Sequence, residues 1–253
     1  YAKGASVITM MEHAIGPEKW KTVVRRFMEK LAWKTAGASD FTAVLAEVAG
    51  AEVASSFESF LNQPGVPLIT VTPVCGASSP PGLKIEQERF LPLGTTAAGA
   101  LWNVPVCVRY GAGRKSGRAC TFLSEKSREV PLPDLGTCPE WVVPNEEGMG
   151  YYVSEYSADD IGRLAGKGEA PVSLEERAAL VRDVGLLVSN GAVPLGKALE
   201  LVPGAVASGD KTTLQSVQSI FRNVRSSDLP EPLFEKLQRF ARKTFTPRAR
   251  ALG

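Results

Sequence analysis

The period of the hydrophobic pattern changes twice along the chain, and this change limits the folds that the sequence can adopt. Up to about residue 62, apolar residues recur every three or four positions, as in amphipathic helices. From about residue 66 to 156, short runs rich in β-branched and aromatic residues take their place. Helical spacing returns from about residue 173. The sequence therefore predicts a mixed multi-domain fold, in which an all-β module lies between two helical regions.

Four helices are predicted in the first region from their capping residues and apolar stripes. Gly16 is placed to close the first helix, and Pro17 suits the first turn of the second. Ser39 or Asp40 is the expected N-cap of the third helix, which Gly50 ends. Four successive helices with short joints indicate part of a bundle.

The middle region contains seven short runs with the composition of β-strands, separated in several places by turn clusters. The runs are "PLITVTPV", "LKIEQERF", "WNVPVCVRY", "RACTFLSE", "EVPLP", "EWVVPN" and "GYYVSEY". Their spacing predicts a small antiparallel β-sandwich and argues against a parallel sheet with crossover helices. Pro105 in the third run favours an edge strand or a bulge at that point. We expect this module to be a spacer that carries no catalytic group.

The third region begins with a capping box, in which Ser173 and Glu176 satisfy each other's backbone amides at a helix start. Gly191 is the expected end of that helix, and Asp210 is the expected cap of a later one. The helix pairs resemble the start of a solenoid, although no strict repeat is visible. The predicted domains are therefore residues 1–65, 66–158 and 159–253.

Composition excludes several functions. The net charge is +2, from 29 basic and 27 acidic residues, so no strong attraction to nucleic acid is expected. No run of apolar residues is long enough to span a membrane. His13 is the single histidine, which excludes every metal site built from several histidines.

The four cysteines lack the spacing of a zinc site or a disulfide scaffold. They are Cys75, Cys107, Cys120 and Cys138. We favour buried thiols, and the alternative is a disulfide between Cys107 and Cys120 if their strands are neighbours. A single histidine with scattered cysteines offers no plausible zinc ligand set, so we expect this chain alone to bind no zinc.

Several segments resemble, in the same order, the aminopeptidase-N family of zinc peptidases (gluzincins). They are "YAKGASVITMMEH", "NQPGVPLITV", "QERFL" followed by "WNVPVCVRYG", "WVVPNEEGMGYYVSEY" and "SLEERAALVRDVGLLVSNG". Each motif is weak alone, but five in family order form a strong resemblance. It implies that residues 1–65 are the last helices of a catalytic domain. Residues 66–158 would then be a β-sandwich, and residues 159–253 the beginning of a helical domain.

The resemblance assigns one catalytic residue to this chain. Tyr1 matches the family tyrosine whose hydroxyl helps to stabilise the oxyanion formed when zinc-bound water attacks the peptide carbonyl. The family's H-E-x-x-H and G-x-M-E-N motifs, which lie upstream of this tyrosine, are absent from the sequence. We therefore expect a C-terminal segment of a longer zinc aminopeptidase that is inactive alone. Its expected partners are a peptide substrate and the remaining N-terminal part of the catalytic domain.

The alternative function is a non-catalytic, peptidase-like scaffold or protein-interaction module. The upstream sequence discriminates between the two, because only the enzyme requires the two missing motifs. The sequence does not determine the compartment, although we slightly favour the cytoplasm.

Overall fold

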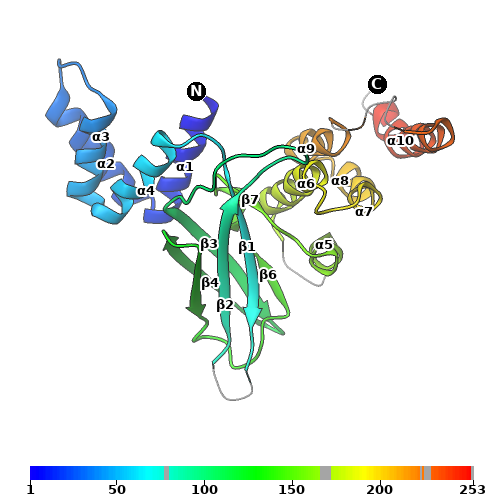
Figure 1. Cartoon of the computed structure of the whole chain (residues 1–253), viewed down its shortest axis with the longest axis horizontal. Coiled ribbons are helices and arrows are strands. Elements are labelled where there is room, and N and C mark those ends of the chain that lie inside the picture. Colours follow the sequence, from blue (N-terminus) through cyan, green and yellow to red (C-terminus); the bar gives the residue numbers. More distant parts are fainter. Residues whose placement is uncertain (77–79, 166–171, 223, 225–228, 252–253) are drawn as a thin grey trace. The chain divides into compact units, whose positions relative to one another are not determined.

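The computed structural model describes residues 1–76, 80–165, 172–222, 224 and 229–251. Within this part the chain forms two compact units (Figure 1). Unit 1 comprises Tyr1–Phe90 and Ala98–Ser154, and unit 2 comprises Leu91–Ala97 and Glu155–Gly253. The fold is mixed, with mostly antiparallel sheets and many helices, as the sequence predicts.

Unit 1 begins with four helices whose ends coincide with glycines and prolines. They are α1 (Ala2–Ile15), α2 (Pro17–Leu31), α3 (Ala38–Ala49) and α4 (Ala51–Asn62). Gly16 separates the first two with φ 86°, a conformation that glycine adopts without a steric cost. The predicted cap of α3 is wrong: Gly37 is the N-cap, and the Asp40 carboxylate accepts a hydrogen bond from its amide at 2.8 Å.

Two sheets follow, and their strands match the predicted runs closely. The strands are β1 (Pro67–Val74), β2 (Gly82–Arg89), β3 (Val104–Ala112), β4 (Lys115–Leu123), β5 (Ser127–Pro131), β6 (Trp141–Val143) and β7 (Val153–Ser154). A short 3-10 helix, η1 (Glu146–Gly148), precedes β7. One sheet has the order β5-β2-β1-β7 and the other β4-β3-β6. Part of the predicted turn between β1 and β2, residues 77–79, lies outside the described residues.

The pairing departs from the sequence prediction in two places. β1 and β2 are long antiparallel neighbours (Figure 1), but β1 and β7 form a short parallel pair. β3, which contains Pro105, is the central strand of its sheet rather than an edge strand. The proline is tolerated because β6 pairs with β3 only at Arg109–Gly111, so the proline end of β3 pairs with β4 alone among the described strands.

Helices and sheets of unit 1 share one hydrophobic core. Met10 and Phe60 from the helices belong to the same buried cluster as Ile85 and Val106 from the two sheets. Gln87 is a polar member of this interior, and only 2% of its surface is exposed. Its side-chain amide donates to the carbonyls of Trp102 at 2.8 Å and Leu123 at 2.9 Å, which joins β2 to the other sheet.

Unit 2 is helical in its described part. Its helices are α5 (Ala158–Ala165), α6 (Leu174–Ser189), α7 (Leu195–Leu199), α8 (Val202–Ser208), α9 (Lys211–Arg222) and α10 (Glu231–Ala251). The capping box at α6 is present, with Ser173 and Glu176 bonded reciprocally at 2.9 and 3.1 Å. Asp210 caps α9 through the Thr213 amide at 2.6 Å, as predicted.

α6 and α9 make the main helix–helix contact of unit 2. The two helices approach closely at Gly185, where an added Cβ would lie 2.7 Å from the backbone of Ser219. No described helix of the chain combines the length and hydropathy needed to cross a membrane.

Candidate functional site

Tyr1, the residue assigned by the resemblance, is the N-cap of α1. Its side chain is fully exposed and makes no capping hydrogen bond, while its carbonyl accepts from the Ala5 amide at 2.9 Å. Within the described residues, the phenol therefore neither packs in the core nor caps the helix. The ring projects from a helix that is well anchored further along.

Lys3 anchors the first turn of α1. Its ammonium donates to the carbonyl of Gln63 at 2.9 Å and so ties the start of α1 to the residue that follows α4. Gly4, in the same motif, has open space where a Cβ would be built. Among the described residues, the lysine thus has an evident positioning role, whereas no close packing accounts for the glycine.

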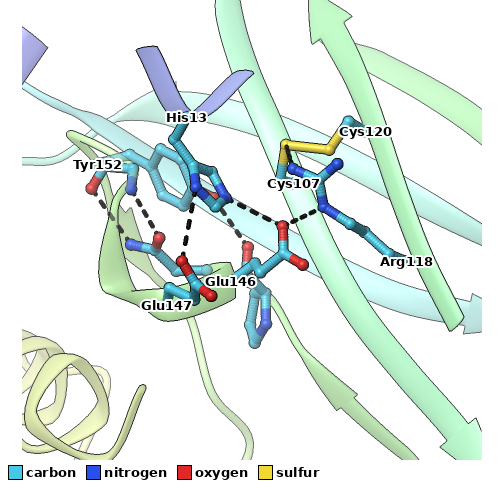
Figure 2. Close-up of a disulfide and its surroundings, with 10 residues drawn as sticks. His13, Cys107, Arg118, Cys120, Glu146, Glu147 and Tyr152 are labelled. Atoms are coloured by element: carbon cyan, nitrogen blue, oxygen red, sulfur yellow. Dashed lines mark hydrogen bonds and ion pairs between the residues drawn. A yellow bond between two sulfur atoms is a disulfide. The ribbon is translucent and has the colours of Figure 1, made fainter. Parts of the chain in front are cut away.

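The other end of α1 meets a cluster of three charged or titratable side chains and a disulfide sulfur. We call it the His13 cluster and define it as His13, Cys107, Arg118 and Glu146 (Figure 2). His13 Nε2 lies 3.0 Å from Glu146 Oε2, and the Arg118 guanidinium donates to the same carboxylate oxygen. The side chain of Glu146 is 9% exposed and that of His13 is 18% exposed. One largely buried carboxylate is therefore shared by an imidazole from α1 and a guanidinium from β4.

A closed loop of hydrogen bonds holds Glu146 in place. The Asn145 side chain accepts from the Gly150 amide at 2.7 Å and donates to the Gly150 carbonyl at 3.2 Å. The Tyr152 hydroxyl donates to the Pro144 carbonyl at 2.9 Å. These bonds fix both ends of the segment that contains η1, so the position of the carboxylate does not depend on Arg118 alone.

Cys107 completes the cluster, and its state corrects the sequence interpretation. The favoured reading of buried thiols is wrong, because the structure pairs Cys107 with Cys120 and Cys75 with Cys138 in disulfides. Cys107 and Cys120 are directly opposite each other on β3 and β4, which is the condition that the alternative required. The guanidinium of Arg118 lies 3.6 Å from Cys107 Sγ (Figure 2).

Sequence reasoning missed this grouping, since its members are far apart in the chain and His13 has no nearby ligand in sequence. The structure brings His13, Cys107 and Glu146 together so that one ligand atom of each lies within 4.8 Å of the others. A cavity of about 10 Å³ lies beside them and is lined by all three residues. The sequence held one usable signal: Cys107 and Cys120 lie at equal distances on either side of the tight turn at Gly113 and Arg114.

Comparisons with known proteins agree with the resemblance. Residues 1–60 match the peptidase family M1 domain, and residues 141–253 match the ERAP1-like C-terminal domain. Both describe one class of protein, the M1 metallopeptidases, which are hydrolases. The two matches and the relatives described next make the chain similar to a segment of aminopeptidase N-family proteins.

Individual relatives are similar over most of the chain. Aminopeptidase M1-C of Oryza sativa subsp. japonica is 27% identical and covers 100% of this chain. Aminopeptidase N of Plutella xylostella is 25% identical over 93% of the chain, and the Tricorn protease-interacting factor F2 of Thermoplasma acidophilum is 24% identical over 87%. The matched regions make up 29%, 26% and 25% of these relatives, so the chain spans little more than a quarter of their length.

Members of this family are generally zinc-dependent, but the residues of this chain do not fit the family's catalytic zinc site. The sequence has a single histidine and no H-E-x-x-H motif. The groups with ligand chemistry in the His13 cluster are already engaged: Glu146 is bonded to His13 and Arg118, and Cys107 is in a disulfide. We therefore derive no catalytic step through a metal held by this chain.

Proposed function

We propose that this chain is part of an aminopeptidase that removes N-terminal residues from peptides, and that it contributes Tyr1 to catalysis. The observation that carries the proposal is the position of Tyr1 at the start of α1, whose first turn Lys3 anchors to Gln63. The match of residues 1–60 to the peptidase family M1 domain supports it.

The chemistry requires a neutral hydrogen-bond donor at this place. Attack on a peptide carbonyl creates an oxyanion that exists only in the transition state and the tetrahedral intermediate. A phenol that donates to this oxygen stabilises the transition state more than the substrate, and only such differential binding accelerates the reaction. The bond from Lys3 to Gln63 holds the first turn of α1, so the hydroxyl is presented from a fixed backbone.

The rest of the chain is proposed to support this role. Residues 1–65 would complete the catalytic domain, residues 66–158 would form a β spacer, and residues 159–253 would begin a helical lid over the substrate. The match of residues 141–253 to the ERAP1-like C-terminal domain supports the last assignment. Because Tyr1 cannot act without the groups that activate water, the chain alone is expected to be inactive and the substrate to be bound jointly with the N-terminal part of the enzyme.

The test is Tyr1→Phe in the full-length protein. This change deletes only the hydroxyl, so folding and metal content should stay close to wild type. The chemical step should slow by roughly a hundred- to a thousandfold, which corresponds to about 2.7–4 kcal/mol of lost transition-state stabilisation. Steady-state kinetics on an aminoacyl substrate should show kcat and kcat/KM falling together with little change in KM.

Tyr151→Phe is the matched control, because it deletes the same atom from a ring that packs edge-on against Phe60 in the core. It should retain the wild-type kcat. If Tyr1→Phe raised KM alone, Tyr1 would only hold substrate. If the variant kept the wild-type kcat and KM, Tyr1 would have no role in catalysis. If the full-length sequence lacked the H-E-x-x-H and G-x-M-E-N motifs, the scaffold function would replace the enzyme.

A further inference from the structure

We propose that reduction of the Cys107–Cys120 disulfide converts the His13 cluster into a binding site for one divalent transition-metal ion, with zinc as the best match. The ligands would be His13, Cys107 and Glu146. The proposal concerns groups at the far end of α1 from Tyr1 and does not rest on the aminopeptidase function.

The geometry needs little rearrangement. The three ligand atoms lie within 4.8 Å of one another, and the His13–Glu146 separation is already 3.0 Å. Around a tetrahedral zinc ion, bonds of about 2.0–2.3 Å place neighbouring ligand atoms roughly 3.3–3.8 Å apart. The cavity of about 10 Å³ beside them is close to the smallest space that holds a single water-sized particle. It suits one ion and is far too small for an organic ligand.

The ligand types select the metal. An imidazole, a thiolate and a carboxylate together suit zinc, whereas magnesium and calcium prefer oxygen ligands alone. The charges also balance, because a thiolate and a carboxylate together neutralise a divalent cation. Three protein ligands leave one position of a tetrahedron for solvent.

The disulfide controls access to the site. Cys107 is 5% exposed, whereas Cys120 is exposed, so an external thiolate meets Cys120 first. Attack of one thiolate of a dithiol on Cys120 Sγ breaks the Cys107–Cys120 bond and releases Cys107 as the thiolate. The second thiolate of the dithiol then displaces Cys120 from the mixed disulfide. The protein disulfide gains two electrons, the dithiol is oxidised to its own disulfide, and both sulfurs of the protein become thiols or thiolates.

Arg118 is the competitor of the metal. Its guanidinium contacts Glu146 and lies near Cys107 Sγ, so the surroundings already stabilise one positive charge. Its side chain is 48% exposed and does not line the cavity, so it has a path into solvent when a divalent ion takes its place. Removing this charge by substitution of Arg118 should therefore strengthen metal binding. If Arg118 only held the cluster in shape, the same substitution would weaken metal binding.

The decisive experiment compares Cys120→Ser with Cys107→Ser in the full chain, without reductant. Both variants break the same disulfide by the same atomic change, but only Cys120→Ser leaves the buried thiol beside His13 and Glu146. Titrated with cobalt(II), Cys120→Ser should bind about one ion per chain. It should show a sulfur-to-cobalt charge-transfer band and the intense visible bands of a tetrahedral site, both of which zinc displaces. Cys107→Ser should show neither.

Ligand variants in the Cys120→Ser background assign the site. His13→Asn and Glu146→Gln should each weaken zinc binding by about a hundredfold or more, since even loss of a residue that only orients a ligand costs 10- to 100-fold. Arg118→Gln should tighten it by about tenfold or more. Equal cobalt spectra for the two cysteine variants, or affinity that survives loss of both His13 and Glu146, would overturn the proposal.

The wild-type cysteines give an independent version of the test. In a Cys75→Ser/Cys138→Ser protein, a phosphine reductant can act only on Cys107–Cys120, and the phosphine is oxidised to its oxide. Metal binding should appear on reduction and disappear on reoxidation. A folded, reduced protein without the thiolate–cobalt band would refute the proposal even if Cys120→Ser failed to fold.

Discussion

Units 1 and 2 are stabilised in different ways. In unit 1, residues far apart in sequence meet in one core, and two disulfides join its strands and loops. Unit 2 contains no cysteine, and none of the residues of its long helix α10 is buried. Its helices α6 and α9 approach closely at Gly185 and Ser219. Disulfides and contacts between strands and helices thus stabilise unit 1, whereas the described part of unit 2 is stabilised by the packing of helices through side chains such as Leu187 and Ile220.

This difference can be measured unit by unit. All four tryptophans, Trp20, Trp33, Trp102 and Trp141, belong to unit 1, so tryptophan fluorescence reports its unfolding. Hydrogen exchange of α6 and α9 reports unit 2. The two signals together show which unit a substitution destabilises.

The largest effect should come from removing the Cys75–Cys138 disulfide with two Cys→Ser substitutions. The bridge closes a loop with a sequence separation of 63 residues, and the chain-entropy model assigns such a loop about 4 kcal/mol of stability. The Cys107–Cys120 bridge, with a separation of 13, should contribute about 3 kcal/mol. Denaturant unfolding followed by fluorescence measures both losses.

Unit 2 serves as the internal control, because its hydrogen exchange should not change in either variant. A larger loss from the shorter loop, or a loss that appears in α6 and α9, would contradict the view that the disulfides stabilise unit 1 alone.

Gly185→Ala should destabilise unit 2 by about 1–3 kcal/mol, since the added methyl would overlap Ser219 and force α6 and α9 apart. Gly204→Ala is the matched control, because Gly204 is an exposed glycine of α8 with open space at the Cβ position. That change should be neutral or stabilise by about 0.5–1 kcal/mol. Fluorescence should remain at the wild-type value in both cases. Equal effects of the two alanines would show that the α6–α9 approach is not tight.

The smallest effect concerns pH and the cap of α9. Hydrogen bonds from backbone amides, first that of Thr213, hold the pKa of Asp210 below its ordinary value. The carboxylate therefore stabilises the folded helix above the ordinary pKa of about 3.9, and this contribution is lost as the pH falls through the lower, folded-state value. Asp210→Asn keeps a capping oxygen but loses the charge.

At neutral pH the asparagine variant should have slightly faster exchange in α9 than wild type, and the difference should vanish in acid. Asp210→Ala, which loses the cap as well, should be less protected than the asparagine variant throughout. If the difference in α9 exchange between wild type and Asp210→Asn grew in acid, the charged carboxylate would not be the stabilising form.

The sequence was informative about most helix ends and strands, which depend on neighbouring residues, although it misplaced the cap of α3. Gly16 and Gly50 marked helix ends, Ser173 and Asp210 marked caps, and the β-type runs matched the strands because side-chain pattern and backbone state are local properties. Tyr1 is exposed on α1, but its catalytic role stays a prediction.

What the sequence did not reveal depends on the register between distant segments. The parallel pairing of β1 with β7 joins residues about 85 positions apart, and the Cys75–Cys138 bridge has no local signal. The hydrogen bond between His13 and Glu146 spans 133 positions. By contrast, Cys107 and Cys120 face each other across a hairpin whose turn is short, so counting outward from the centre of the Gly113–Arg114 turn brings this pair together.

The short segment Leu91–Ala97 has a consequence for the order in which the molecule can fold during synthesis. It belongs to unit 2 although unit 1 residues flank it on both sides, and the Leu93 amide donates to the Ser189 carbonyl at 2.9 Å. A ribosome adds about 5–20 residues per second, so Leu93 waits roughly ten seconds for Ser189 to be made. During that interval the strands on either side can already pair, and the segment emerges as a loop of a nearly finished unit. The helical unit is therefore completed only after both of its separate segments have been synthesised, and no single cut in the chain releases either unit whole.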